Sequence, residues 1–160
     1  SPTMHSITLS PCHPVTLSNS ERNPTMSNAA VVNQFFQTFG RQHDVEGCEP
    51  LFAESMSVNT TAAPGTLDKN GYKQLGYVFL GGFPDLNVDV LEQYEVGDRV
   101  ITRVAWGGTH SGSLMGIPPT GRAYRSEAIF IDRVTGGQIQ ERREISDMLG
   151  MMQQLGLVPM

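Results

Sequence analysis

The chain has 160 residues, of which 39% are hydrophobic and 17% are charged, with a formal net charge of −5. That length fits one domain, and the apolar fraction is large enough for a core, so wholesale disorder is excluded. No apolar run approaches the roughly 20 residues of a transmembrane helix. An acidic chain without a Lys/Arg cluster argues against nucleic acid and anionic membrane surfaces as partners. We therefore expect a soluble, cytoplasmic globular domain.

Residues 1–25 are predicted to be an N-terminal extension, with the domain itself covering residues 26–160. Thirteen of these 25 residues are Ser, Thr or Pro, and no apolar pattern recurs among them. Such a composition buries too little surface to offset the entropy lost on ordering. A signal peptide is a poor fit, because a basic n-region and a continuous apolar h-region are both missing.

Helices are expected first along the domain. A helix capped by Asn28 should run to about residue 42, because Val and Phe residues recur there at helical spacing. A short helix over 45–53 and a short strand over 56–60 follow. A third helix is expected over 68–80, ended by two consecutive glycines.

Strands are expected from Leu86 onward, where the hydrophobic period changes to two. Helices collected at one end of the chain, with hairpin-linked strands after them, predict an α+β domain with an antiparallel sheet. A terminal helix over 148–155 closes the chain. The expected strands lie between 86 and the Gly97-Asp98 turn, over 100–106, over 124–134 and over 139–146.

Several motifs follow one another along the last two-thirds of the chain. They are Phe83-Pro84-Asp85-Leu86, Trp106-Gly107-Gly108-Thr109-His110-Ser111-Gly112, Met115-Gly116-Ile117-Pro118-Pro119-Thr120-Gly121, Ile129-Phe130-Ile131-Asp132-Arg133 and the block from Asp147 to Gly156. In this order and spacing, the chain resembles the SnoaL-like polyketide (ester) cyclase family over about 28–158. The resemblance implies an NTF2-like cone, a curved antiparallel sheet wrapped around N-terminal helices with an internal apolar pocket. It also implies ring closure by intramolecular aldol chemistry with no cofactor.

One motif departs from the family pattern. Where the family commonly shows Glu-His-Trp-Asp, this chain has Glu141-Arg142-Arg143-Glu144. The departure predicts that Arg143 replaces an aromatic wall of the pocket, and that Glu144 stands where the family has an aspartate. This change of motif puts in question both the type of substrate and the catalytic activity that the resemblance implies.

Strict alternation along the last expected strand sorts its side chains into two faces. The face that holds both isoleucines is expected to point into the pocket, and the wholly polar face is expected to point to water or to a neighbouring subunit. The inward set is Ile139, Glu141, Arg143, Ile145 and Asp147, and the outward set is Gln140, Arg142, Glu144 and Ser146.

Asp147 is the first candidate for catalysis. In an apolar pocket its pKa would be raised, so that it could exchange protons with a carbon acid. The alternative is structural, because Asp147 precedes the terminal helix and would cap it well. Glu141 and Arg143 form either a buried ion pair or a substrate-binding pair, in which Arg143 binds a carboxylate or carbonyl group.

His110 is the second catalytic candidate, as a general acid, with exposure or a backbone hydrogen bond as the alternative reading. Four aromatic residues are candidates for substrate binding, although they could be plain core. No spaced set of His, Cys and Asp residues is typical of a metal site, so no metal is expected, and the resemblance implies no cofactor. The four aromatic candidates are Trp106, Phe36, Tyr72 and Phe79.

Two functions remain open from the sequence. The first is a cofactor-independent cyclase or isomerase acting on a hydrophobic carbonyl compound, in which Asp147 moves the proton and Arg143 stabilises the developing oxyanion. The second is a non-catalytic protein that holds a small apolar molecule in the same pocket. The resemblance further implies a homodimer, formed through an exposed face of the sheet.

Overall fold

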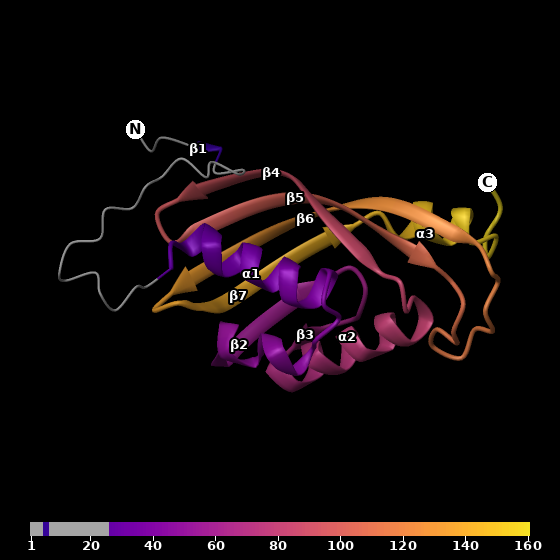
Figure 1. Ribbon diagram of the computed structural model, residues 1–160, viewed down its shortest axis with the longest axis horizontal. Coiled ribbons are helices and arrows are strands. Elements are labelled where there is room, and N and C mark those ends of the chain that lie inside the picture. The colour runs from indigo at the N-terminus through magenta and orange to yellow at the C-terminus, as the bar shows by residue number, and fades with distance from the viewer. Residues whose placement is uncertain (1–4, 7–25) are drawn as a thin grey trace.

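The computed structural model describes residues 5–6 and 26–160 (Figure 1). Helices precede most of the strands along this part of the chain, as the sequence predicts. The elements in chain order are β1 (His5–Ser6), α1 (Asn28–Gly40), the 3₁₀ helix η2 (Glu46–Leu51), β2 (Phe52–Thr60), β3 (Thr66–Leu67), α2 (Lys69–Gly82), β4 (Asn87–Val96), β5 (Arg99–Thr109), β6 (Ala123–Thr135), β7 (Gln138–Ser146) and α3 (Met148–Gln154).

The strands form one sheet in the order β1-β4-β5-β6-β7-β2-β3. From β4 to β7 the strands are a continuous antiparallel meander, and β2 joins the far side of β7 in parallel. Figure 1 shows the sheet curving over α1 and α2, with α3 at the end nearest the C-terminus. The predicted α+β fold, a curved sheet around N-terminal helices, is confirmed. The sequence pattern predicts only antiparallel pairing, so the parallel pairing of β2 with β7 is a feature that it does not predict.

Capping and apolar spacing explain both long helices. The hydroxyl of Ser27 accepts a hydrogen bond from the amide of Ala30 at 3.1 Å, so Ser27 rather than Asn28 is the N-cap of α1. Asp68 caps α2 in the same way through the amide of Gly71, at 2.7 Å. The last residue of α1 is Gly40, where a Cβ would lie 2.8 Å from a methyl group of Val88.

Strand β6 alternates almost perfectly between buried and exposed side chains. Strand β7 does not, because a bulge interrupts its pairing with β6. Arg133 pairs with Glu141 and Val134 pairs with Ile139, which leaves Gln140 without a partner across the ladder. One extra residue reverses the faces of the strand beyond it. Ile139 is therefore buried before the bulge, and it is Arg142 that is buried after it.

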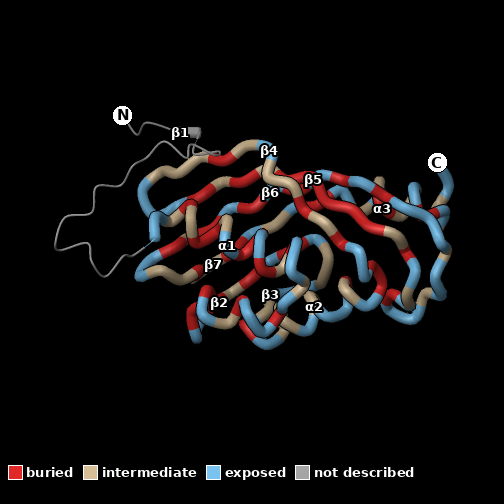
Figure 2. Tube along the Cα trace, viewed as in Figure 1, coloured by how far each residue is buried: buried red, intermediate tan, exposed pale blue. Residues whose placement is uncertain are grey.

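Buried residues follow the central strands and the inner sides of the helices, as Figure 2 shows in red. Aromatic rings dominate this core in two groups. The first group gathers around Phe35, Phe36, Phe52, Tyr72 and Phe130, and the second around Phe79, Phe83, Trp106 and Tyr124. Within the described residues, no helix is both long and apolar enough to cross a bilayer.

Most of the predicted N-terminal extension lies outside the described residues. Its strand β1 is the described part, and it pairs antiparallel with β4 at the edge of the sheet. Main-chain pairing therefore links two residues of the extension to the domain. The boundary at residue 26 stays a prediction.

Candidate active site

A cavity of about 80 Å³ lies between the helices and the concave face of the sheet. Its wall is almost entirely apolar, with side chains from α1, η2, α2 and every strand from β4 to β7. All four aromatic candidates from the sequence line it, namely Phe36, Tyr72, Phe79 and Trp106. Apolar pockets with a few polar groups are the usual form of a small-molecule site.

Glu144 brings a carboxylic acid into this wall. It lies beyond the bulge on β7 and is half-buried, and the hydroxyl of Ser146 donates a hydrogen bond to it at 2.9 Å. Burial raises the pKa of Glu144, because desolvation disfavours its charged form. The prediction that Glu144 faces outward is wrong, and the alternation that produced it fails at the bulge.

Arg142 and Asp132 form a fully buried ion pair beside the cavity. Two guanidinium nitrogens of Arg142 donate to the two carboxylate oxygens of Asp132, at 2.7 and 3.0 Å. The guanidinium also lies 4.0 Å from the ring centroid of Phe35 and 4.8 Å from that of Phe130. Such stacking suits a weakly hydrated, planar cation. The outward placement predicted for Arg142 is also wrong.

The buried pair reaches the cavity through Tyr72. Arg142 donates a hydrogen bond to the Tyr72 hydroxyl oxygen at 3.1 Å. Burial raises the pKa of Tyr72, so the phenol stays protonated at neutral pH. Because the oxygen already accepts from Arg142, the hydroxyl hydrogen is directed elsewhere. Tyr72 is therefore an oriented donor in the wall that also holds Glu144.

Glu141 and Arg143 lie on the outer face of the sheet, which corrects their predicted place in the pocket. They form an ion pair at 3.5 Å, and the side chain of Arg143 is 64% exposed. Arg99 also lies 3.5 Å from Glu141. The reason is the bulge at Gln140, which turns both side chains away from the cavity. Arg143 therefore replaces no wall of this pocket.

Asp147 is an exposed helix cap rather than a pocket residue. Its carboxylate accepts from the amide of Gly150 at 2.9 Å, so the structural alternative for this residue is correct. The same bulge explains why its predicted inward direction is wrong. Position 150 suits glycine, because a Cβ there would lie 2.2 Å from a carboxylate oxygen of Asp147.

Substitutions at Asp147 are expected to affect the cap alone. Asn caps a helix about as well as Asp, so Asp147→Asn should leave stability and turnover near wild type. Asp147→Ala should cost about 1 kcal/mol of unfolding free energy, since a capping oxygen is lost. Chemical denaturation and turnover assays check both variants. A large loss of turnover in Asp147→Asn would return this residue to the catalytic candidates.

His110 is fully buried and lies outside the cavity wall. Its Nδ1 accepts from the backbone amide of Thr120 at 3.3 Å and lies 3.1 Å from the Thr120 hydroxyl. Of the two alternatives to catalysis, the backbone hydrogen bond is therefore observed and exposure is wrong.

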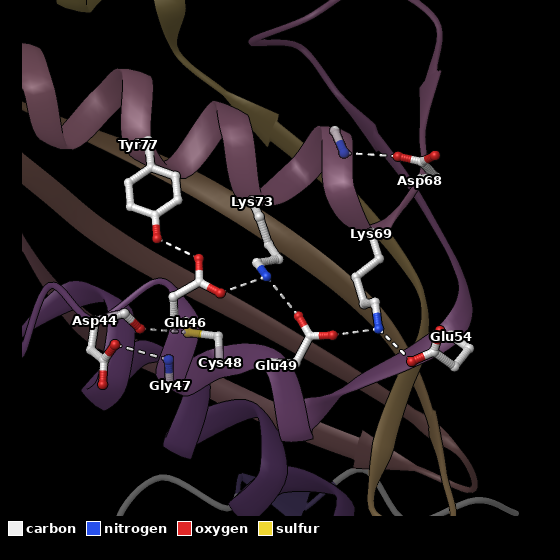
Figure 3. Close-up of polar contacts among 11 residues, drawn as sticks. Asp44, Glu46, Gly47, Cys48, Glu49, Glu54, Asp68, Lys69, Lys73 and Tyr77 are labelled. Carbon is white, nitrogen blue, oxygen red and sulfur yellow. Dashed lines mark hydrogen bonds and ion pairs between the residues drawn. The ribbon is translucent and has the colours of Figure 1, made fainter.

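Ion pairs hold α2 against η2 at the edge of the cavity (Figure 3). Lys73, which lines the cavity, lies 2.8 Å from both Glu46 and Glu49. Lys69 lies 2.6 Å from both Glu49 and Glu54. The side chains of Lys69 and Lys73 are only 10% and 14% exposed, whereas those of the three glutamates are 40–93% exposed. This wall of the cavity is thus closed by ion pairs between nearly buried lysines and carboxylates that face the solvent.

Two further chemistries find no support in the described part of the chain. No group of three or more His, Cys, Asp or Glu residues there could hold a metal ion. Cys48 lines the cavity, but burial raises its pKa to about 12, so it is a neutral thiol and a poor nucleophile. In the wall, Glu144 supplies a carboxylic acid and Tyr72 a hydroxyl oriented by Arg142.

The family model for SnoaL-like polyketide cyclases matches residues 30–155. The chain belongs to the SnoaL-like polyketide cyclase family. Among curated SnoaL-like relatives, the aklanonic acid methyl ester cyclase DnrD of Streptomyces peucetius is 36% identical over 72 residues, which is 45% of this chain and 50% of DnrD. The nogalonic acid methyl ester cyclase of Streptomyces nogalater is 39% identical over 49 residues, 31% of this chain and 37% of that enzyme. The chain thus matches half or less of the length of these relatives.

Solved structures agree on the fold. IdmH from Streptomyces antibioticus, provisionally designated a polyketide cyclase, is 29% identical with a TM-score of 0.74, over 82% of this chain and 99% of IdmH. A protein from Catenulispora acidiphila with a ketosteroid isomerase-like fold has a TM-score of 0.68 at 16% identity, over 80% of this chain and 93% of that one. At that identity the likeness concerns the fold alone. The family and the NTF2-like fold predicted from the motifs are confirmed.

Proposed function

We propose that this chain is a cofactor-independent cyclase that closes a ring in a hydrophobic, polyketide-like carbonyl substrate, with Glu144 as the proton-transfer group. The observation that carries the proposal is an ionisable carboxyl group in the wall of an otherwise apolar cavity. A raised pKa makes the ionised form of Glu144 a stronger base than an exposed glutamate. The names of the curated relatives supply the substrate class.

The proposed reaction is an intramolecular aldol addition. The Glu144 carboxylate takes a proton from the carbon next to a substrate carbonyl, which leaves an enolate. The enolate carbon attacks a second carbonyl of the same molecule, so that a carbon–carbon bond forms and a C=O π bond breaks. The new alkoxide then recovers the proton from Glu144, so product and substrate are isomers. Tyr72, oriented by Arg142, is suited to donate to the enolate oxygen.

The size of the cavity bears on substrate entry. Drug-sized ligands occupy pockets of about 300–1,000 Å³, whereas this cavity measures about 80 Å³. We infer that the α2–η2 wall moves outward when a substrate enters. The ion pairs of Lys69 and Lys73 with the glutamates of η2 and β2 are the contacts that such a movement would separate.

A conversion assay tests this function directly. Chelator-treated protein would be incubated with aklanonic acid methyl ester or nogalonic acid methyl ester, and the products separated by chromatography with mass detection. We expect a new product of unchanged mass, since ring closure is an isomerisation. Saturable binding of either ester without any conversion would instead support the non-catalytic binding protein.

The predicted homodimer remains a proposal, and the outer face of the sheet supports it. Ile129 and Ile145 pair across β6 and β7 and are 46% and 69% exposed, and Ile131 on the same face is 38% exposed. Sedimentation equilibrium at high micromolar concentration should therefore give a dimer, which Ile145→Asp should weaken strongly. Leu149→Asp is the control, because Leu149 is similarly exposed but lies on α3. A monomeric wild type would contradict the proposal.

A further inference from the structure

Three buried side-chain atoms have no hydrogen-bond partner among the described residues. They are Nε1 of Trp106, Nε2 of His110 and the hydroxyl of Tyr124. The three residues are 9%, 0% and 4% exposed. Most buried polar atoms in folded proteins are paired, and each unpaired one costs free energy. Three in one region therefore indicate a site whose partner is not part of the fold.

The strand register brings these residues together. Trp106 and His110 flank Gly108 on the inner face of β5 and its continuation, and Tyr124 on β6 pairs with Gly108. Cross-strand partners point to the same side of a sheet, so the three side chains are neighbours on the concave face. Glycine at position 108 leaves space for Phe83 beside these side chains, because a Cβ there would lie 3.0 Å from the Cβ of Phe83.

Aromatic contacts join the three residues into one cluster around Phe83. The ring centroid of Phe83 lies 4.7 Å from that of Tyr124 and 5.6 Å from that of His110. The centroids of Tyr124 and Trp106 are 5.1 Å apart. We call Trp106, His110 and Tyr124 the donor cluster.

Every unpaired atom of the donor cluster can donate a hydrogen bond. The indole nitrogen of Trp106 only donates. The backbone amide of Thr120 donates to Nδ1 of His110, so the free Nε2 carries a hydrogen. Burial raises the pKa of Tyr124, which keeps its phenol protonated. Hydrogen-bond donors of this kind suit an oxygen acceptor and do not suit a cation.

The donor cluster adjoins the cavity of the candidate active site. Trp106 and Phe79 line that cavity, whereas Tyr124 and His110 do not. The ring centroid of Phe79 lies 5.6 Å from that of Trp106 and 6.3 Å from that of Phe83. Phe79 thus lies between the cavity and Phe83, which contacts Tyr124 and His110. A rotation of the Phe79 side chain would extend the cavity from Trp106 toward Tyr124 and His110.

We propose that Trp106, His110 and Tyr124 form a binding site for a ketone or ester carbonyl oxygen of the substrate, which reaches them past Phe79. The proposal rests on the proposed function for its ligand class, a hydrophobic carbonyl compound. It gives the donor cluster a role in binding, separate from the proton transfer assigned to Glu144. It also assigns His110 a binding role in place of the acid chemistry predicted from the sequence.

A matched pair of probes tests the proposal without any turnover. 2-Acetylnaphthalene and 2-ethylnaphthalene are similar in size and shape, and only the first has a carbonyl oxygen. Their dissociation constants would be measured with wild type, Tyr124→Phe, Glu144→Gln and Tyr94→Phe. Tyr94 is the matched control, because its hydroxyl donates to Glu92 on the same strand, β4, at 2.7 Å.

We expect wild type to bind the acetyl probe about tenfold more tightly than the ethyl probe, as one hydrogen bond to the oxygen would give. Tyr124→Phe should lower this preference by weakening the acetyl probe alone, because it removes one of the three donors. Glu144→Gln and Tyr94→Phe should both keep it. Because neither probe can cyclise, a failure of the proposed turnover would not alter this result.

Three outcomes would overturn the proposal. The first is an unchanged preference in Tyr124→Phe, and a lowered Tm in that variant would then assign the donors to a structural water. The second is a preference lost in Glu144→Gln but kept in Tyr124→Phe, which places the oxygen beside Tyr72 and Glu144. The third is the absence of binding by either probe at millimolar concentration, which would show that the donors are inaccessible.

Discussion

Replacing Asp132 by asparagine is expected to lower the Tm by about 10 °C. Asp132 and Arg142 are both fully buried, and the substitution leaves the guanidinium charge without its counter-ion. Breaking a buried pair on one side typically costs about 3–5 kcal/mol, and a chain of this size loses about 2–4 °C per kcal/mol. Thermal unfolding followed by circular dichroism measures the loss.

A double variant distinguishes the effect of the two buried charges on stability from the effect of the volume that their side chains fill. Asp132→Leu combined with Arg142→Met removes both charges and keeps apolar volume, so most of the lost stability should return. Glu127→Gln is the exposed control, because Glu127 pairs with Arg103 at the surface of the same sheet, and it should leave the Tm nearly unchanged. A single Asp132→Asn variant as stable as wild type would contradict the buried-pair account.

Glu144→Gln is expected to reduce turnover by at least 10²-fold, the usual contribution of a positioned acid or base. Glutamine keeps the size of the side chain and its hydrogen bond from Ser146, but it cannot take a proton. Binding of the substrate should change little, since the surrounding wall is apolar. Asp147→Asn is the matched control. It also removes one carboxylate, but one that lies outside the cavity, so its turnover should match that of wild type.

The same variant should be more stable than wild type at neutral pH. Because burial raises the pKa of Glu144 above its value in the unfolded chain, the ionised side chain destabilises the fold. This penalty is absent at a pH below the unfolded pKa, grows as the pH rises from the unfolded to the folded pKa, and is constant above the folded pKa. The Tm of Glu144→Gln should therefore exceed that of wild type at about pH 7 and match it near about pH 4.

The sequence predicts the fold well and the site only in part. Helical spacing in α1 and period-two alternation in β6 each act over a dozen residues, so single exceptions do not disturb them. The aromatic wall follows from the same patterns, because in a hollow fold the inner core is also the pocket. The sequence therefore predicts Phe36, Tyr72, Phe79 and Trp106 as wall residues, and all four line the cavity.

The wrong predictions concern mainly β7, where one unpaired residue, Gln140, reverses the direction of every side chain after it. Gln140 carries no glycine or proline signal for a bulge, and Glu141-Arg142-Arg143-Glu144 is polar on both faces. Two isoleucines therefore had to define the inward face, and the structure buries Ile139 while Ile145 is 69% exposed. The one available signal was the family motif, which has an acidic residue at the position of Glu144.

The dependence of kcat/KM on pH, measured for wild type and Glu144→Gln with aklanonic acid methyl ester, tests the central claim most directly. If Glu144 is the base, the wild-type rate should rise with pH through a carboxyl pKa higher than the ordinary 4.5. The residual rate of Glu144→Gln should lack that rise. A Glu144→Gln profile that keeps the same rise, at a rate close to wild type, would show that another group transfers the proton.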